Sequence, residues 1–330
     1  MNEIKKVLIK VPKLGNEIFL TFPFITLISE EMPKAEIFVL VEEGDLLAFQ
    51  FLPFKVKVFE RPKEKKNLIE THHMVANLNE IFNIDLFFDL ENTFNSAFIG
   101  FNFRAKERVG YDMGWNKHLL TKKYKSEFDN NFERRSVRLL EQFLGKEFKD
   151  FKLAHPIGET QVVSNVEPLF KDAEPPKYIL IMLDNFSSVT REIDLWKSFF
   201  DSFENQKFII WALENENVIS DIFSKIDLGK NELFMHRGSM PKELNYLLKK
   251  MTGVITNNDW AESLCGYYNI SFISFVTIER RLPEYSYFRF RPLRILFKDN
   301  IPQEILHVDE QRKFSNMNEV IDFIHFNFKL

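Results

Sequence analysis

The chain has 330 residues, a formal net charge of −4 and 45% hydrophobic residues, which is enough for two domains that each bury a core. The acidic balance argues against bulk nucleic-acid binding, which needs a basic surface. Cys265 is the only cysteine, so an intramolecular disulfide and a cysteine-based zinc site are both excluded. A chain without disulfides fits a reducing compartment, and we predict a cytoplasmic protein.

The first half alternates between strand and helix patterns. Pro12 interrupts the first apolar strand too early for a signal peptide, and no apolar run reaches the roughly 18 residues that span a bilayer. A helix that begins at residue 16 ends before Pro33, and a later helix ends before Gly145. We predict strands at 6–11, 35–41 and 85–89, and helices at 16–30, 67–82 and 132–144.

The second half repeats this alternation after a stretch in which the periodicity fades among prolines at 156, 168, 175 and 176. We therefore predict domains at 1–155 and 177–330 with a linker at 156–176. We predict strands at 178–183, 207–213, 232–235, 253–256, 271–275 and 294–298, and helices at 191–203, 218–226, 242–251, 259–268 and 316–328. Alternation of this kind predicts an α/β protein with parallel sheets, in which ligands bind at the carboxyl edges of the strands.

A loop between the first strand and the first helix carries the most distinctive motif, K-V-P-K-L-G-N-E-I-F-L-T-F-P at residues 10–23. Gly15 allows a ligand to approach the backbone at this strand-to-helix turn. The segment resembles the opening of the family 9 glycosyltransferases, the bacterial lipopolysaccharide heptosyltransferases, which read K/R-x-x-x-x-G-D-x-x-x-x-x-P. The family's aspartate is the general base. Its position here is Asn16, and an amide does not accept a proton near neutral pH.

The resemblance extends over residues 6–275. The segment 85–97, D-L-F-F-D-L-E-N-T-F-N-S-A, is similar to the family's D-L-V-I-D-L-Q-G-L-L-R-S-A, and 108–112, R-V-G-Y-D, is similar to R-I-G-F-D. The helix at 133–145 matches H-x-x-E-R-Y-L-x-L-L-x-x-L-G in part. The resemblance implies the GT-B fold, in which two Rossmann-like domains hold an acceptor and a nucleotide-sugar donor.

Two motifs of the second half resemble the family's donor site. The segment T-R-E-I-D-L-W at 190–196 is similar to T-R-x-x-K-x-W-P, with Asp194 in place of the family's phosphate-contacting lysine. Trp196 also suits a buried helix face, and we favour that interpretation. The segment T-N-N-D-W-A-E-S-L-C-G at 256–266 aligns with G-N-D-T-G-P-M-H-L-A-A, whose Asp-Thr-Gly cradles the diphosphate of the donor. Trp260 and Ala261 replace Thr-Gly, and Leu264 replaces the histidine.

Without the family, the spacing of Asp259 and Glu262 predicts a capping box, that is, an ordinary helix start. Both interpretations stay open at this point. Adjacent histidines at 72 and 73 diverge on a helix, and no set of ligand residues accompanies them, so we predict no metal site.

The resemblance assigns the candidate site residues. The donor-binding candidates are Gly15, which also borders the acceptor side, Thr190, Arg191, Asn258, Asp259 and Trp260. The acceptor-binding candidates are Arg61, Lys63, Lys65 and Lys66, and the alternative for this basic run is a solvated loop. The catalytic candidates are Asn16 at the family's base position, and Glu17 and Asp112 as carboxylates that could replace it.

The function that the resemblance implies is transfer of a sugar with inversion, heptose from ADP-heptose, onto a lipopolysaccharide core. No cofactor beyond the nucleotide sugar is expected, and the enzyme is expected at the cytoplasmic face of the inner membrane, in peripheral contact with its surface. The departures at 16, 194, 260 and 261 leave two alternatives open. One is a catalytically degraded homologue that binds a glycolipid or a partner protein, and the other is a transferase with a different donor and a relocated base.

Overall fold

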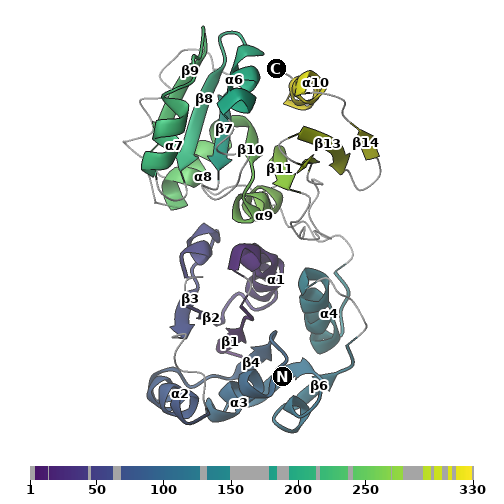
Figure 1. Ribbon diagram of the computed structural model, residues 1–330. Coiled ribbons are helices and arrows are strands. Elements are labelled where there is room, and N and C mark those ends of the chain that lie inside the picture. The colour runs from purple at the N-terminus through teal and green to yellow at the C-terminus, as the bar shows by residue number, and fades with distance from the viewer. Residues whose placement is uncertain are drawn as a thin grey trace. The chain divides into compact units, whose positions relative to one another are not determined.

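A computed structural model describes residues 4–13, 15–43, 46–61, 68–126, 132–148, 178–183, 193–212, 216–236, 241–268, 270–277, 293–298, 301–306, 311–313 and 317–328. The chain divides into two compact units, one with the elements up to Leu144 and one with the elements from Tyr178 on (Figure 1). Both units are α/β, as the alternating pattern predicts. The predicted linker at 156–176 lies outside the described residues, so its bounds stay a prediction.

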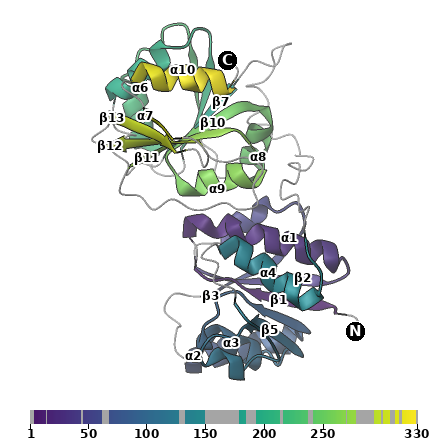
Figure 2. The same ribbon diagram turned by 90° about the vertical axis from the view of Figure 1, so that its right-hand side faces the viewer.

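The first unit contains a six-stranded parallel sheet in the order β3-β2-β1-β4-β5-β6. Its strands are β1 (Lys6–Lys10), β2 (Glu36–Glu42), β3 (Lys57–Arg61), β4 (Leu86–Asp89), β5 (Glu107–Tyr111) and β6 (Lys122–Tyr124). Its helices are the 3₁₀ turns η1 (Gly15–Thr21), η2 (Leu46–Phe51) and η3 (Asn116–His118), and α1 (Phe22–Glu31), α2 (Leu68–Phe82), α3 (Phe94–Asn102) and α4 (Phe132–Leu144). Helices α1 and α4 cover one face of the sheet, and α2 and α3 cover the other (Figure 2).

Alternate side chains of the first sheet enter opposite layers, as the strand period of two requires. Leu8 and Phe87 pack under α2 and α3 in one apolar cluster. Phe88, the next residue, points to the other layer, where its ring centroid lies 5.2 Å from that of Phe24 in α1. A Cβ on Gly100 of α3 would lie 2.3 Å from the Phe87 ring, so this helix position must be glycine for the helix to approach the sheet.

The second unit contains an eight-stranded sheet in the order β14-β13-β12-β11-β10-β7-β8-β9. Strands β7 to β12 are parallel, and β13 and β14 are antiparallel additions at one edge. The strands are β7 (Tyr178–Leu183), β8 (Lys207–Ala212), β9 (Glu232–His236), β10 (Met251–Thr256), β11 (Phe272–Thr277), β12 (Leu293–Lys298), β13 (Ile301–Leu306) and β14 (Gln311–Lys313). The helices are α6 (Ile193–Asp201), α7 (Glu216–Phe223), α8 (Pro241–Lys250), α9 (Asp259–Tyr268) and α10 (Met317–Phe328).

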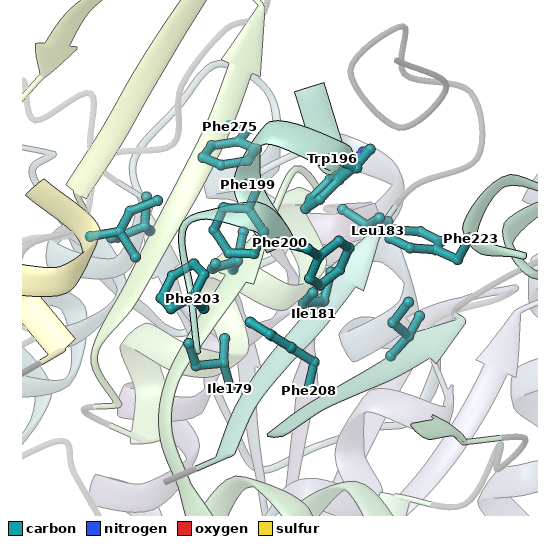
Figure 3. Close-up of a cluster of buried hydrophobic side chains, with 14 of the residues drawn as sticks. Ile179, Ile181, Leu183, Trp196, Phe199, Phe200, Phe203, Phe208, Phe223 and Phe275 are labelled. Carbon is teal, nitrogen blue, oxygen red and sulfur yellow. The ribbon is translucent and has the colours of Figure 1, made fainter. Parts of the chain in front are cut away.

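Phenylalanine and isoleucine side chains fill the core of the second unit between the sheet and α6, α7 and α10 (Figure 3). The Trp196 side chain is fully buried there, and its ring lies against those of Phe199, Phe223 and Phe275 at centroid distances of 5.7, 5.5 and 5.9 Å. The favoured interpretation of Trp196 as a core residue is therefore confirmed. Aromatic rings at these distances add about 0.5–1.5 kcal/mol per pair to the gain from burial.

Most predicted elements form within two residues of their predicted bounds. The strand at 178–183 and the helices at 132–144 and 259–268 form with the bounds predicted. The predicted helix at 16–30 instead begins as the 3₁₀ turn η1, and the α-helix starts at Phe22, next to Pro23. Five of the strands in the described ranges were not predicted, namely β3, β5, β6, β13 and β14.

Candidate functional site

Each sheet has one topological switch point, at which the connections from two neighbouring strands run toward opposite edges of the sheet. In the first sheet β1 pairs with β2 on one side and with β4 on the other, and in the second sheet β7 pairs with β8 and β10. Ligands of open α/β sheets bind at the carboxyl ends of the strands at such a switch point. The Gly15 loop follows β1, and residues 257–258 follow β10. The structure therefore places both family-like loops at switch points, each in its own unit.

A row of buried charges closes the carboxyl edge of the first sheet on the α2/α3 side. The row runs across β3, β2, β1 and β4 as Arg61, Glu42, Lys10 and Asp89. The Glu42 Oε1 atom lies 3.1 Å from the Lys10 Nζ and 3.9 Å from the Arg61 guanidinium. These residues stand two positions after apolar core residues on the same strands, so the sheet carries an ionic layer directly above its apolar layer.

Lys10 is fully buried and ties three segments together. Its Nζ donates to the Val11 carbonyl oxygen at 2.7 Å and to Glu42 at 3.1 Å, and it lies 2.9 Å from the Glu91 Oε2. Val11 begins the loop that leads to Gly15, and Glu91 lies in the loop after β4. Lys10 therefore fixes the start of both loops that border the first switch point.

Asp89 is fully buried beside Lys10, with which it is paired in register. Its Oδ1 accepts the backbone N–H groups of Glu91 and Asn92 at 3.1 and 2.9 Å, which shapes the turn into α3. Burial raises the pKa of Asp89 to about 7, and the Glu91 carboxylate adds to the rise, whereas Ser96, the Asn92 N–H and Lys10 oppose it. The turn after β4 therefore holds a carboxyl group that titrates near neutral pH.

The catalytic candidates lie at the same edge. Gly15, Asn16 and Glu17 form the first turn of η1, and their side chains lie outside what the structure describes. Asp112 directly follows β5, and 45% of its side chain is exposed, with Oδ1 3.9 Å from the Lys117 Nζ. Asp112 is thus an exposed carboxylate two strands away from the Gly15 loop.

The acceptor candidates divide into two groups. Arg61 ends β3 and is buried, and its guanidinium donates to the Thr71 hydroxyl of α2 at 3.0 Å. Its charge is therefore directed into the protein, not into a solvated loop. Lys63, Lys65 and Lys66 lie outside the described residues, and so do the donor candidates Thr190 and Arg191.

The start of α9 is the described part of the second switch point. The Asn258 side-chain oxygen accepts the backbone N–H groups of Trp260 and Ala261 at 2.8 and 3.3 Å, so Asn258 is the N-cap of the helix. The predicted capping box of Asp259 and Glu262 is therefore wrong by one position, because Asp259 is already the first helical residue.

Thr256 fixes this cap to the sheet. Its hydroxyl donates to the Met182 carbonyl oxygen of β7 at 2.7 Å and accepts the Asn258 N–H at 3.0 Å. The cap is thus joined to both strands of the switch point. A helix N-terminus attracts anions through its free N–H groups, and here two of them already bind the Asn258 amide.

The residues that replace the family's cradle differ in their exposure. Ala261 and Leu264 are fully buried and face the core, whereas Trp260 is only partly buried. Trp260 is therefore the replacement that remains at the surface of the helix start.

Sequence reasoning missed the ionic row, although Arg61 was a candidate for another reason. Lys10 and Asp89 stood inside recognised motifs, yet their side chains were not assigned to a site. Their position could have revealed them. Each is a charged last residue of an apolar strand, and its side chain points to the same face of the sheet as the core residue two positions earlier.

Among the described residues, no cluster of histidine, cysteine, aspartate or glutamate could hold a metal ion. No described helix has the length and apolar character needed to cross a membrane.

Comparison with known proteins gives matches in structure only. No protein-family model and no curated protein matches the sequence. A glycosyl transferase family 9 structure from Veillonella parvula matches with a TM-score of 0.67 and 11% identity over 90% of this chain and 87% of that chain. The ADP-heptose lipopolysaccharide heptosyltransferase II of E. coli matches with a TM-score of 0.63 and 14% identity over 98% of both chains. The E. coli heptosyltransferase WaaC with ADP matches with a TM-score of 0.63 and 13% identity over 98% of this chain and 99% of that chain.

The chain has the GT-B fold. The fold expected from the family-like motifs is thereby confirmed over nearly the whole length. In GT-B terms, the first unit supplies the Gly15 loop and the ionic row, and the second supplies α9 with its Asn258 cap.

Proposed function

We propose that the chain is a glycosyltransferase of the family 9 type, which transfers a sugar from a nucleotide-sugar donor onto a lipopolysaccharide core acceptor with inversion. The sugar that the resemblance favours is heptose, with ADP-heptose as donor. The observation that carries the proposal is the match of the whole fold to heptosyltransferase structures, one of them with ADP, combined with family-like loops at both switch points.

The proposed roles follow from these positions. Asn258, Asp259 and Trp260 at the start of α9 contact the donor diphosphate together with Thr190 and Arg191. The loop with Gly15 and Asn16 borders the acceptor. Inverting transfer needs a base for the acceptor hydroxyl and stabilisation of the departing diphosphate.

The carboxylates proposed for the base are Asp112 and Glu17, since Asn16 lacks one. The acceptor's anionic groups are proposed to meet Lys63, Lys65 and Lys66. The reaction is proposed to need no metal ion and to occur at the cytoplasmic face of the inner membrane.

A second candidate function is favoured by one observation in each unit. The family's base position is Asn16, and the amide of Asn258 takes two N–H groups that a diphosphate would use. A homologue that has lost transfer and binds a glycolipid or a partner protein would show both features.

Thermal unfolding with a panel of ADP-, UDP-, GDP- and CDP-sugars and the free nucleotides tests the donor site. A ligand at 100 times its Kd stabilises by about 2.7 kcal/mol, which corresponds to a few degrees for a protein of this size. We expect ADP compounds to raise the melting temperature. In a second assay, we expect transfer of the sugar to a truncated core glycolipid. If no compound of the panel changes the melting temperature, the proposed transferase is refuted and the binding protein is favoured.

The Asn16→Asp variant tests the base position. If the family's base site is otherwise intact, the aspartate should raise the transfer rate at least about tenfold, because general-base catalysis contributes about 10²–10⁴-fold. An unchanged rate would show that the base lies elsewhere.

The Asn258→Gly variant tests whether the cap competes with a diphosphate. Glycine keeps the cap conformation at a cost of only a few tenths of a kcal/mol and leaves the N–H groups of Trp260 and Ala261 open. We expect tighter ADP binding by calorimetry. Asn205→Gly is the matched control, since Asn205 is exposed, has a φ of 57° and lies away from α9 in sequence. Equal ADP affinity in both variants would dismiss the competition.

A further inference from the structure

An exposed tryptophan stands at the corner of the first sheet, in the loop between β5 and η3. The Trp115 side chain is 77% exposed, and Met113, two residues earlier, is 45% exposed. Exposed lysines follow at 123 and 125, at the end of the edge strand β6. We call these four residues the corner surface.

The corner surface is held in place by buried polar contacts. The Asn116 Oδ1 accepts the Met113 N–H at 3.1 Å, and its Nδ2 donates to the Tyr111 carbonyl oxygen at 3.2 Å. Asn116 itself is fully buried. These contacts hold the backbone around Trp115, and the Trp115 ring centroid lies 5.9 Å from that of His118. The exposed tryptophan therefore stands in a loop that buried polar contacts hold in place.

The charge around this loop is positive in a chain that is acidic overall. Residues 113–126 contain four lysines and one histidine and no acidic residue. In sequence, Asp112 precedes the segment directly, and Glu127 and Asp129 follow it. The Asp112 Oδ1 lies 3.9 Å from the Lys117 Nζ. Glu107 on β5 is also near, since burial and then the Glu107 charge raise the pKa of Tyr124. The local charge is therefore opposite in sign to that of an anionic surface.

The corner surface lies on the carboxyl edge, where the switch point also lies. The Asp112 N–H donates to the Tyr124 carbonyl oxygen at 2.8 Å, which brings Met113 and Lys125 to the same corner. The Tyr111 N–H donates to the Asn92 Oδ1 at 3.2 Å, which joins the end of β5 to the turn after β4. Two strand spacings, about 10 Å, separate β5 from β1 along the sheet.

We propose that the corner surface docks the first unit onto an anionic phospholipid bilayer, with Trp115 and Met113 in the headgroup region and the lysines above the charged headgroups. Tryptophan prefers this interface, and lysines beside it add attraction to anionic lipid. Lysines on an edge strand also prevent sheet-to-sheet pairing, but that role does not account for an exposed tryptophan in a fixed loop. The proposal deepens the proposed function, because it presents a lipid-linked acceptor to the edge that holds the Gly15 loop.

Vesicle flotation of the full chain tests the proposal. The vesicles are phosphatidylcholine alone or with about 30% phosphatidylglycerol, at about 0.1 M salt, where charges within about 10 Å still interact. We expect binding to the anionic vesicles only. Each lysine near an anionic surface contributes about fivefold, so Lys123→Glu with Lys125→Glu should weaken binding at least about 25-fold. Trp115→Ser should weaken it at least about threefold.

Matched controls keep the assay specific. Lys34→Glu with Arg104→Glu makes the same charge change on exposed residues at the amino edge of the same sheet, and Phe326→Ser removes an 80% exposed ring in the second unit. Both should bind like the parent chain. Vesicles with brominated acyl chains should quench the fluorescence of the Trp260→Phe chain, which lacks the partly buried tryptophan of α9. Adding Trp115→Phe should remove most of this quenching, since the remaining Trp196 and Trp211 are 0% and 4% exposed.

The proposal is overturned if the parent chain does not bind anionic vesicles. It stays overturned in that case even if Trp115→Ser weakens binding to a partner protein. Binding that the corner variants and the control variants weaken equally would also overturn it. The assay contains neither donor nor acceptor, so its result does not depend on whether the chain transfers a sugar.

Discussion

Replacing Lys10 by methionine should destabilise the first unit strongly. Methionine keeps the apolar stem of the side chain but removes a fully buried ammonium group. The Val11 carbonyl oxygen and the carboxylates of Glu42 and Glu91 lose contacts of 2.7, 3.1 and 2.9 Å. Removing one partner of a buried ion pair costs about 3–5 kcal/mol, because the other charge stays buried.

The local structure places the effect at the lower end of this range. The Glu91 side chain is 24% exposed and can turn toward water. The Glu42 side chain is 11% exposed and, in the part of the chain that the structure describes, keeps the Arg61 guanidinium at 3.9 Å. We therefore expect a loss of about 3 kcal/mol, mostly from Glu42 and the unpaired Val11 oxygen. For a unit of about 150 residues this lowers the melting temperature by roughly 6–12 °C.

Thermal and guanidinium unfolding, followed by circular dichroism, measure this change. Lys57→Met is the matched control, because Lys57 also pairs with a glutamate of the neighbouring strand, Glu36, but is 55% exposed. An exposed pair of this kind contributes about 0–1 kcal/mol. Adding Glu42→Gln to Lys10→Met should restore part of the stability. Equal losses for Lys10→Met and Lys57→Met would refute the assignment of an ionic layer to this edge.

The other predictions concern a buried carboxyl group and a tight glycine. The pKa of Asp89 is raised from 3.8 to about 7, so the folded state holds its proton longer than the unfolded state, and stability falls as the pH rises from about 4 to about 7. Asp89→Asn should remove about 2–3 kcal/mol of the fall between pH 5 and pH 8 in urea titrations; an unchanged slope would contradict the raised pKa. Gly253→Ala places a Cβ 2.4 Å from the Phe328 ring and should cost about 1–3 kcal/mol, and Phe328→Leu in the same chain should recover part of this loss if the clash is its cause.

The fold was predictable because apolar strands and amphipathic helices alternate. Strand β7, with six buried residues, shows this pattern without interruption. Strand β3 was missed because its sequence, K-V-F-E-R, has polar residues at both ends. Strand β6 was missed because its sequence, K-K-Y, contains no apolar run. Both lie at edges of the first sheet, where one side of the strand has no neighbour and the hydrophobic signal is weak.

The candidate site was predictable only in part. The Gly15 loop and the start of α9 were found because their backbone chemistry leaves a motif in the sequence. The Asn258 cap was missed because asparagine and aspartate are equally good caps, and the sequence offered both at adjacent positions. The row of Lys10, Glu42 and Asp89 was missed because its members come from three strands that only the sheet brings together.

The same row limits where a catalytic base can stand. A base needs a pKa near the working pH and access to the acceptor hydroxyl. Asp89 meets the first condition, with a pKa of about 7, but it is fully buried and its Oδ1 already shapes the turn into α3. Glu42 is committed to Lys10 in the same layer. Among the site candidates, this leaves the exposed Asp112 after β5 and Glu17 at the first turn of η1 as the carboxylates proposed for the base.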